Sequence, residues 1–268
     1  MIEQNYDSAG AHVRIKTHAP SGTIILDRPA ARNALSRQSM GELKRAFDDL
    51  HQERRVRAVI LTGAGSAFCS GIDLAEIQAT SESDGAMTQW HHDVVQYKEL
   101  LETMLRFPRP IIAAVNGPAV GAGAGLVLAS DIVVGTESAR FGFPEVRRGL
   151  VAGVATPLLT FRMGAGRAAN LLLTGRLMDA HQAEAWGIYH ELVKLEHVWA
   201  RAHQVATEVS SAAAESLQMT KRLVNETIGE LLRTLMTAGA AVSATARTTE
   251  AASEGLAAFL EGREPDWP

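Results

Sequence analysis

An uncharged, glycine-rich segment most strongly limits what this chain can fold into. Residues 116–131 read NGPAVGAGAGLVLASD and follow the short apolar run 111–115, so that no charged residue occurs between positions 110 and 130. Such a stretch is long enough for a marginal membrane span. A proline, an asparagine and four glycines interrupt it, however, and its apolar residues fall into two short groups. The pattern therefore favours a buried strand, a turn and a short buried helix over 123–129.

The glycine spacing leaves the purpose of this segment open. A dinucleotide fingerprint begins at Gly121 and Gly123 but finds Leu126 at its third position, and the register that starts at Gly123 ends on Leu128. A phosphate loop needs a lysine after the last glycine, and the segment has none. A turn with free N–H groups at a helix N-terminus could stabilise negative charge on an oxygen. Taken alone, the segment favours a simpler explanation, tight packing of a strand against a helix.

The rest of the chain predicts an α/β fold with a helical C-terminal part. Apolar runs predict strands at 12–18, 23–27, 58–62, 111–115, 131–135 and 139–143. Helices are predicted at 36–51 with Ser36 as N-cap, from Asp73 onward, and at 87–107, where Pro108 and Pro110 follow. The pattern is almost wholly helical from residue 155. We therefore expect a core over residues 1–200 and a helical region over 201–268.

Composition excludes several classes of protein. With 268 residues, 46% hydrophobic and 21% charged, the chain can bury a large core. The net charge is −4 and the basic residues do not cluster, which argues against nucleic acid as a partner. The single cysteine, Cys69, cannot form an intrachain disulfide, and the N-terminal residues show no signal-peptide pattern. We therefore expect a cytoplasmic protein that does not enter the membrane.

Five segments in order resemble the crotonase superfamily, the enoyl-CoA hydratases and isomerases. They are LDRPAARNALS (26–36), AVILTGAGSAFCSGIDL (58–74), AAVNGPAVGAGAGLVLASDIVV (113–134), ARFGFPEVRRGL (139–150) and EGLAAFLEGREPDW (254–267). Each motif alone is modest, but their order over nearly the whole chain is highly specific. The resemblance implies a crotonase-like spiral of β-β-α turns, followed by a helical oligomerisation region that builds trimers, often paired into hexamers.

The resemblance also implies the chemistry of the site. In this family two peptide N–H groups hold the thioester oxygen of an acyl-CoA, and they fall here on Ile72 and Ala122. Two such donors would stabilise the enolate that forms when the α-carbon loses or gains a proton. The glutamate of the family's P-E dipeptide falls on Glu145. Because its neighbours are apolar, its pKa is expected to be raised, which suits it to moving a proton.

A second glutamate of the family hydratases is missing. Its position is Gly125, and residues 151–155, where some family isomerases carry an acid, contain none. A single carboxylate can remove a proton at one carbon and return it two carbons away, so the sequence favours isomerisation of an enoyl-CoA double bond. Two alternatives stay open: a hydratase in which His91, His92 or Tyr97 replaces the missing acid, and a protein that binds acyl-CoA without turnover.

Other residues are implied in binding coenzyme A, which would enter as part of the substrate. Arg28 and Arg32 flank a turn that meets the CoA phosphates and adenine in the family, and Arg32 is the better candidate. The remaining candidates for the CoA site are Ala31, Ala34, Ser70, Ile72, Asp73, Leu74, Gly121 and Arg263. From its position, Asp73 is also expected to cap a helix. No histidine or cysteine spacing indicates a metal site, and no prosthetic group is implied.

Overall fold

The computed structural model describes residues 5–6, 12–81, 83–227 and 229–267. Its strands are β1 (Asn5–Tyr6), β2 (Val13–His18), β3 (Ser21–Leu26), β4 (Ala58–Gly63), β5 (Ile111–Val115), β6 (Ala119–Val120), β7 (Ile132–Thr136), β8 (Arg140–Gly142), β9 (Leu177–Asp179) and β10 (Glu191–Val193). Its helices are α1 (Arg37–Gln52), α2 (Leu74–Ser81), α3 (Ala86–Arg106), α4 (Ala122–Ala129), α5 (Thr156–Met163), α6 (Ala165–Thr174), α7 (Ala180–Ala185), α8 (Val198–Ser210), α9 (Ala214–Glu226), α10 (Gly229–Ala246) and α11 (Glu250–Glu261). Short 3-10 turns form η1 (Pro29–Ala31), η2 (Glu145–Arg148) and η3 (Leu195–His197).

A mixed sheet lies at the centre of the molecule, with strand order β1-β2-β3-β4-β5-β7-β10. The pairs β1/β2 and β2/β3 are antiparallel and the remaining pairs are parallel. A smaller sheet has the order β6-β8-β9. The carboxyl ends of β4 and β5 lie side by side, so the loops that follow these two strands emerge together.

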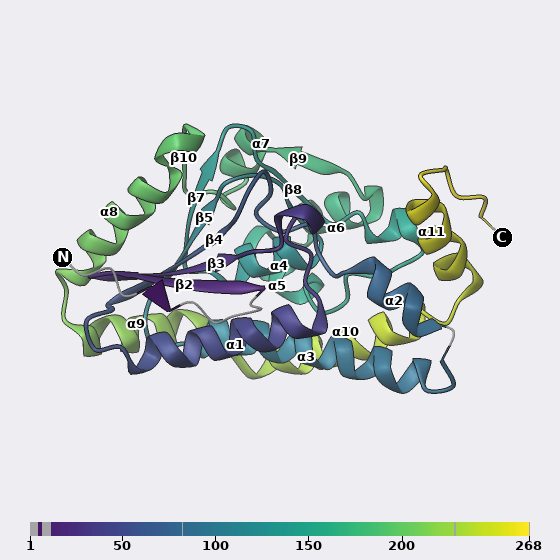
Figure 1. The fold of residues 1–268 in the computed structure, drawn as a ribbon, viewed down its shortest axis with the longest axis horizontal. Coiled ribbons are helices and arrows are strands. Elements are labelled where there is room, and N and C mark those ends of the chain that lie inside the picture. Colours follow the sequence, from purple (N-terminus) through teal and green to yellow (C-terminus); the bar gives the residue numbers. More distant parts are fainter. Residues whose placement is uncertain (1–4, 7–11, 82, 228, 268) are drawn as a thin grey trace.

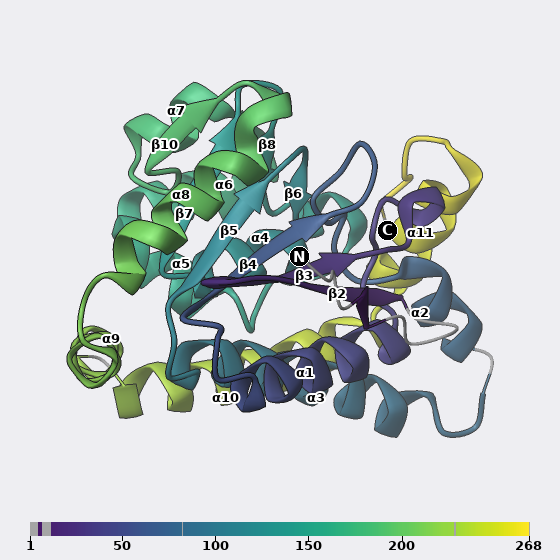
Figure 2. The same ribbon diagram turned by 60° about the vertical axis from the view of Figure 1, so that its left-hand side comes forward.

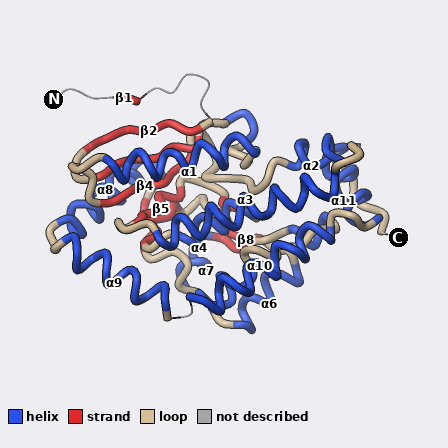
Figure 3. Tube along the Cα trace, turned by 90° about the horizontal axis from the view of Figure 1, so that it is seen from below, coloured by secondary structure: helices blue, strands red, loops and turns tan. Residues whose placement is uncertain are grey.

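Helices cover both faces of the large sheet. The helices α1, α3 and α10 pack side by side in a layer below it, and α8 packs on β4, β5 and β7 from the other face (Figures 1 and 2). Side chains along β4 alternate accordingly: Val59 and Leu61 enter the larger core, whereas Ala58 and Ile60 meet α8. Figure 3 shows the layer from below, with α9 leading into α10.

The glycine-rich segment folds as predicted. Residues 111–129 form β5, a turn that contains β6, and the fully buried helix α4. None of the helices in the described part of the chain is both long and apolar enough to span a membrane. The helix predicted from Ser36 is also confirmed, because the Ser36 side chain accepts a hydrogen bond from the Ser39 N–H at 3.1 Å.

The second half of the chain is mostly helical, as expected, but it contributes two strands that the sequence did not predict. Strand β9 pairs with β8, and β10 pairs in parallel with β7 at the edge of the large sheet. Each has only three residues, too few for a period-two pattern to be recognised. Helix α8 runs through position 200, where the boundary of the core was expected.

Candidate active site

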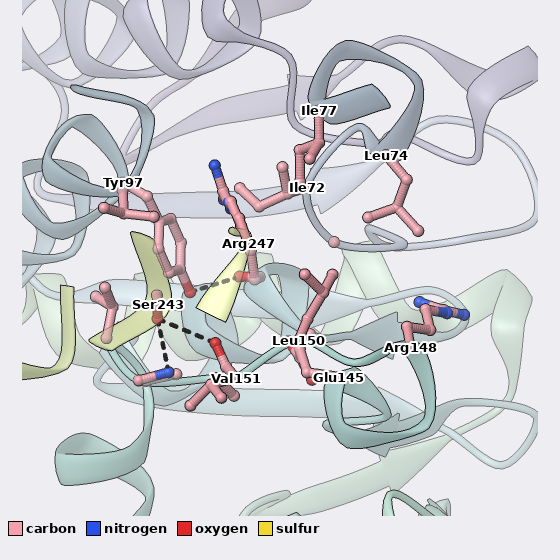
Figure 4. A pocket seen from close by; sticks show the side chains of 18 of the residues that line it. Ile72, Leu74, Ile77, Tyr97, Glu145, Arg148, Leu150, Val151, Ser243 and Arg247 are labelled. Atoms are coloured by element: carbon pink, nitrogen blue, oxygen red, sulfur yellow. Dashed lines mark hydrogen bonds between the residues drawn. The ribbon is translucent and has the colours of Figure 1, made fainter. Parts of the chain in front are cut away.

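A cavity is lined by residues that lie far apart in the sequence, from Ser70 to Arg247 (Figure 4). Its walls come from the loop after β4, the turn before α4, the η2 turn with the loop behind it, the helices α2 and α3, and the end of α10. The lining residues are Ser70, Gly71, Ile72, Leu74, Ile77, Val94, Tyr97, Gly121, Ala122, Glu145, Arg148, Leu150, Val151, Ala152, Gly153, Val154, Ala155, Ser243 and Arg247. Apolar side chains dominate, and the charged groups are one carboxylate and two guanidinium groups.

Two free peptide N–H groups meet on one wall. The Val120 N–H donates to the Cys69 carbonyl at 2.9 Å and holds the two loops together. A Cβ on Gly71 would lie 3.5 Å from the Ala122 nitrogen, so the loops approach closely at this point. Neither the Ile72 N–H nor the Ala122 N–H donates to any residue that the structure describes. Since Ala122 is the first residue of α4, its N–H has no partner within the helix.

Gly121 allows a carboxylate to lie beside this pair of donors. Its φ is +57°, and a Cβ there would lie 2.8 Å from Glu145 Oε1. Its own N–H donates to the Gly142 carbonyl at 2.8 Å, which ties the turn to β8. Glu145 opens η2 directly after Pro144, so the end of β8 carries the carboxylate to the cavity. The close approach requires a residue without a side chain at position 121.

Glu145 has the electrostatics of a group that can exchange protons near neutral pH. Its Oε2 is buried and makes no hydrogen bond to the described residues. Burial disfavours the charged form and raises the pKa of Glu145 to about 7, against smaller opposing effects of a hydrogen bond from its own backbone and of the Arg148 charge. Among the described residues that line the cavity, Glu145 is the one carboxylate.

Tyr97 fills the space beside Gly125. A Cβ on Gly125 would lie 1.8 Å from the Tyr97 hydroxyl oxygen, so a larger residue at 125 and this tyrosine cannot coexist without movement. The hydroxyl donates to the Ala122 carbonyl at 3.0 Å. Burial and the negative charge of Glu145 raise the pKa of Tyr97 well above its ordinary value. Of the three residues considered for the missing acid, Tyr97 reaches the cavity, whereas His91 and His92 are exposed on α3.

The structure brings most of the residues expected for CoA binding to one side of the cavity. Ser70, Leu74 and Gly121 line it together with the two free donors. The Ser70 N–H donates to the Arg32 carbonyl at 3.0 Å, which fixes the turn of residues 29–34 beside the cavity. Ala31 and Ala34 are half-buried in this turn, and the Arg32 side chain is exposed.

Like Ala31, Arg32 and Ala34, the expected residues Asp73 and Arg263 do not line the cavity, and their side chains are bound elsewhere. Asp73 caps α2, accepting from the Ala75 N–H at 3.2 Å, and forms an ion pair with Arg28 at 2.9 Å. Arg263 follows α11 and pairs with Glu254 at 2.5 Å and with Glu261 at 2.6 Å. Both side chains are therefore engaged by other protein groups in this structure.

Several residues of the cavity were not singled out from the sequence. Arg148 stands in the quoted RRGL motif, and its guanidinium stacks 4.0 Å from the centre of the Phe259 ring. Ser243 and Arg247 come from α10 and the turn after it, a region without any motif. Only the tertiary packing of α10 brings these two residues to the site, so no local sequence pattern could have indicated them.

Cys69 and Asp131 have structural roles outside the cavity lining. The Cys69 thiol is fully buried, and burial raises its pKa to about 12, which makes it a poor nucleophile. Asp131 accepts from the Ile111 N–H at 2.7 Å and forms an ion pair with Lys221 at 2.7 Å. It therefore connects the start of β5 to α9.

Comparison with solved structures defines the class of fold. An enoyl-CoA hydratase/isomerase from Xanthobacter autotrophicus Py2 superimposes with a TM-score of 0.86 at 26% identity, covering 94% of each chain. An enoyl-CoA hydratase/isomerase from Pseudoalteromonas atlantica T6c gives 0.84 at 28% identity, covering 96% of this chain and 100% of the other. The mixed sheet with its helical C-terminal part is thus a crotonase fold.

The sequence places the chain within that class. Residues 19–268 match the model of the enoyl-CoA hydratase/isomerase family, and the chain belongs to this family. A Thermus thermophilus relative that carries an enoyl-CoA hydratase name is 39% identical over 242 residues, which are 90% of this chain and 95% of the relative. The 1,2-epoxyphenylacetyl-CoA isomerase of Escherichia coli is 30% identical over 257 residues, 94% and 97% of the two chains. The protein is therefore an enzyme of the enoyl-CoA hydratase or isomerase type.

Proposed function

We propose that this enzyme moves a carbon–carbon double bond next to a CoA thioester, with Glu145 as its single proton carrier. One observation carries the proposal. The sole carboxylate among the described lining residues has an unpartnered buried oxygen and lies against the turn that presents the free Ala122 N–H. A reaction that needs one mobile proton and no held water matches this arrangement.

In the proposed reaction the thioester oxygen of a 3-enoyl-CoA accepts hydrogen bonds from the Ile72 and Ala122 N–H groups. Glu145 removes a proton from the α-carbon, and the electron pair moves onto the thioester oxygen to give a dienolate. Glu145 then returns the proton to the γ-carbon, and the double bond becomes conjugated with the thioester. One such N–H donor contributes about 3 to 4 kcal/mol to stabilising the oxyanion.

The electrostatics support both directions of proton transfer. A base with a pKa of about 7 holds and releases a proton with comparable ease at neutral pH. Tyr97, whose pKa is raised, stays protonated and donates to the Ala122 carbonyl. It thereby helps to hold Ala122, the residue whose N–H is the second oxyanion donor, through the carbonyl of the following peptide.

The nucleotide part of the substrate is proposed to lie along residues 29–34. The half-buried backbone at Ala31 and Ala34 would border the adenine, and the exposed Arg32 would meet the phosphates. Asp73 contributes indirectly, because it holds Arg28 in place at 2.9 Å. Arg263 would contribute only by exchanging Glu254 and Glu261 for phosphate oxygens.

Tyr97 gives a second candidate function, hydration of an enoyl-CoA. Its hydroxyl occupies the space beside Gly125 and points into the same cavity as Glu145. While the phenol proton is donated to the Ala122 carbonyl, the oxygen can still accept a hydrogen bond from a water. Glu145 and Tyr97 would then hold a water between them, and Glu145 would activate it.

Parallel incubations of a 3-enoyl-CoA and a 2-enoyl-CoA in heavy water test the two candidates, with products read by mass. The isomerase proposal expects conversion of the 3-enoyl to the 2-enoyl isomer without added water, and loss of this activity in Glu145→Gln. Glu99→Gln, a change at an exposed glutamate on α3, is the matched control and should behave like wild type.

The other outcomes identify the alternatives. If one water is added to the 2-enoyl-CoA, and this activity is lost in both Glu145→Gln and Tyr97→Phe, the enzyme is a hydratase and not an isomerase. Tight binding of the CoA thioester with neither product nor deuterium uptake would identify a protein that binds acyl-CoA without turnover. Isomerisation that survives in Glu145→Gln would overturn the role of this carboxylate.

A further inference from the structure

Arg247 is a buried charged group of the cavity that the proposed reaction leaves unused. Its side chain is only 7% exposed and lines the cavity from the end of α10, between Tyr97 and Ile72 in Figure 4. The α10 helix is anchored next to it, since Ser243 donates to the Val151 carbonyl and accepts from the Gly153 N–H, both at 3.0 Å. The position of Arg247 is therefore fixed by close packing of α10 against the loop that follows η2.

The acid nearest to Arg247 is already satisfied by other groups. Asp93 accepts from Arg37 Nε at 2.7 Å and Arg37 Nη2 at 2.8 Å, and Gln89 donates to it at 2.9 Å. Arg247 Nη1 stays 3.7 Å from Asp93 Oδ2, beyond hydrogen-bonding distance. In the described part of the chain the Arg247 guanidinium makes no hydrogen bond at all, and its buried Nη1 has only the long ion-pair contact with Asp93.

A buried guanidinium without hydrogen bonds is costly, and a ligand that accepts from it would offset the cost. Burial lowers the pKa of Arg247 to about 10; the negative charge of Asp93 opposes this shift, and the positive charge of Arg37 adds a smaller lowering. The other lining groups near it in Figure 4, Ile72, Ile77 and Tyr97, supply no free carboxylate. A group that comes with the substrate can therefore complete the site.

We propose that the acyl group of the substrate carries a second carboxylate, remote from the thioester, which binds the Arg247 guanidinium. This proposal deepens the proposed function, because it assumes that the cavity takes the acyl part of a CoA thioester. A planar carboxylate can accept two parallel hydrogen bonds from guanidinium, which makes it the acceptor best matched to this site. A cationic acyl group is disfavoured for the same reason.

Binding of saturated CoA thioesters tests the proposal apart from the chemistry, because these compounds have no double bond to move. The probes are matched pairs that differ only in a terminal carboxylate or an isopropyl group of similar shape: succinyl-CoA with 4-methylpentanoyl-CoA, and glutaryl-CoA with 5-methylhexanoyl-CoA. Calorimetry gives the dissociation constant of each. For at least one pair we expect the wild type to bind the carboxylate member about tenfold to hundredfold more tightly.

Three variants assign the preference to one side chain. Arg247→Met keeps the length of the side chain and should lose the preference, or reverse it in favour of the apolar member. Arg247→Lys should retain part of it, because the charge remains while the bidentate geometry is lost. Arg148→Met removes the other arginine of the cavity and should change the dissociation constants of both members of a pair by the same factor. Melting temperatures confirm that each variant is folded.

The outcomes separate this proposal from the proposed function. A preference that disappears in Arg247→Met and persists in Glu145→Gln supports the carboxylate site, whether or not isomerisation is observed. Two results would overturn it. One is equal affinity for the two members of both pairs in the wild type. The other is a preference for the carboxylate member that is lost in Arg148→Met but kept in Arg247→Met. If isomerisation depends on Glu145 but no pair is discriminated, the catalytic proposal stands and Arg247 is only a buried partner of Asp93.

Discussion

At the scale of single residues, the contact of Gly121 with Glu145 connects a backbone conformation to a proton affinity. The absence of a side chain at 121 lets the carboxylate enter a buried space where its Oε2 finds no partner. That burial is the main reason for the raised pKa. The glycine therefore affects the protonation of a group to which it is not bonded.

The first prediction concerns the pH dependence of proton exchange. Because the pKa of Glu145 is raised to about 7, the base form is scarce at low pH, and kcat/KM for deuterium uptake should rise roughly tenfold per pH unit until it levels above about pH 7. The folded protein prefers the protonated carboxyl, so this group also lowers the free energy of unfolding as the pH rises from about 4.5 to 7. Glu145→Gln should remove that loss. An inflection of kcat/KM near pH 4.5 would contradict the burial argument.

The second prediction concerns the pair Gly125 and Tyr97. Gly125→Ala places a Cβ 1.8 Å from the Tyr97 hydroxyl oxygen and should lower the free energy of unfolding by about 1 to 3 kcal/mol. In the Tyr97→Phe background the nearest ring atom lies 3.1 Å from this Cβ, so Gly125→Ala should lower the free energy of unfolding by less. Urea denaturation of the two single variants and the double variant measures the coupling. If the effects of the two single changes on the free energy of unfolding add up in the double variant, Tyr97 moves away from the new Cβ without cost.

The contact between Tyr97 and Gly125 also changes what the absence of a glutamate at position 125 implies. We expect that Gly125→Glu alone does not restore a hydratase site, because Tyr97 occupies the space that the new side chain needs. The sequence shows that position 125 lacks a side chain. It does not show that a residue 28 positions earlier fills the gap, because that depends on how α3 packs against α4.

At the scale of elements, close packing of α10 determines one wall of the cavity. A Cβ on Gly239 would lie 2.1 Å from the Gly153 carbonyl oxygen, so the helix rests directly on the loop backbone. Gly239→Ala should lower the free energy of unfolding by about 1 to 3 kcal/mol and raise KM, because α10 must shift and displace Ser243. Gly166→Ala on α6 is the matched control, since nothing lies within 4 Å of the added Cβ. Equal effects of the two changes would contradict the packing argument.

The elements also show what local sequence can predict. Long amphipathic helices and buried strands can be recognised from the pattern of apolar residues, as in the helix capped by Ser36 and in β4 and β5. Ile72, Ala122 and Glu145 were found because motifs surround them, and they do meet at one cavity. Strand β10 has three residues and Arg247 has no motif, so only the packed molecule reveals their places.

At the scale of the whole molecule, the helices α9 and α10 expose an apolar face. The exposed residues are Met219, Leu223, Val224, Leu231, Leu235 and Val242. Apolar surface of this extent often marks an interface between protein chains. The resemblance to the crotonase superfamily implies a trimer or a dimer of trimers, and we predict that this face contributes to its interface, with a mass measurable by light scattering.

The charge variant Leu223→Glu tests this face, because the side chain is 70% exposed and its change should not disturb the core. We expect smaller assemblies in this variant. Leu195→Glu, at the exposed 3-10 turn η3, should leave the mass unchanged. A wild-type protein that is monomeric at micromolar concentration would refute the prediction.

The cavity joins residues near position 70 to residues near position 247, and this separation has a consequence for synthesis on the ribosome. The loops that carry the two free N–H groups are held together by a bond between Val120 and Cys69, both in the first half of the chain. The wall formed by Ser243 and Arg247 is translated much later. A nascent chain can thus assemble its reactive centre while that centre is still open to water, and the last helices to emerge close it.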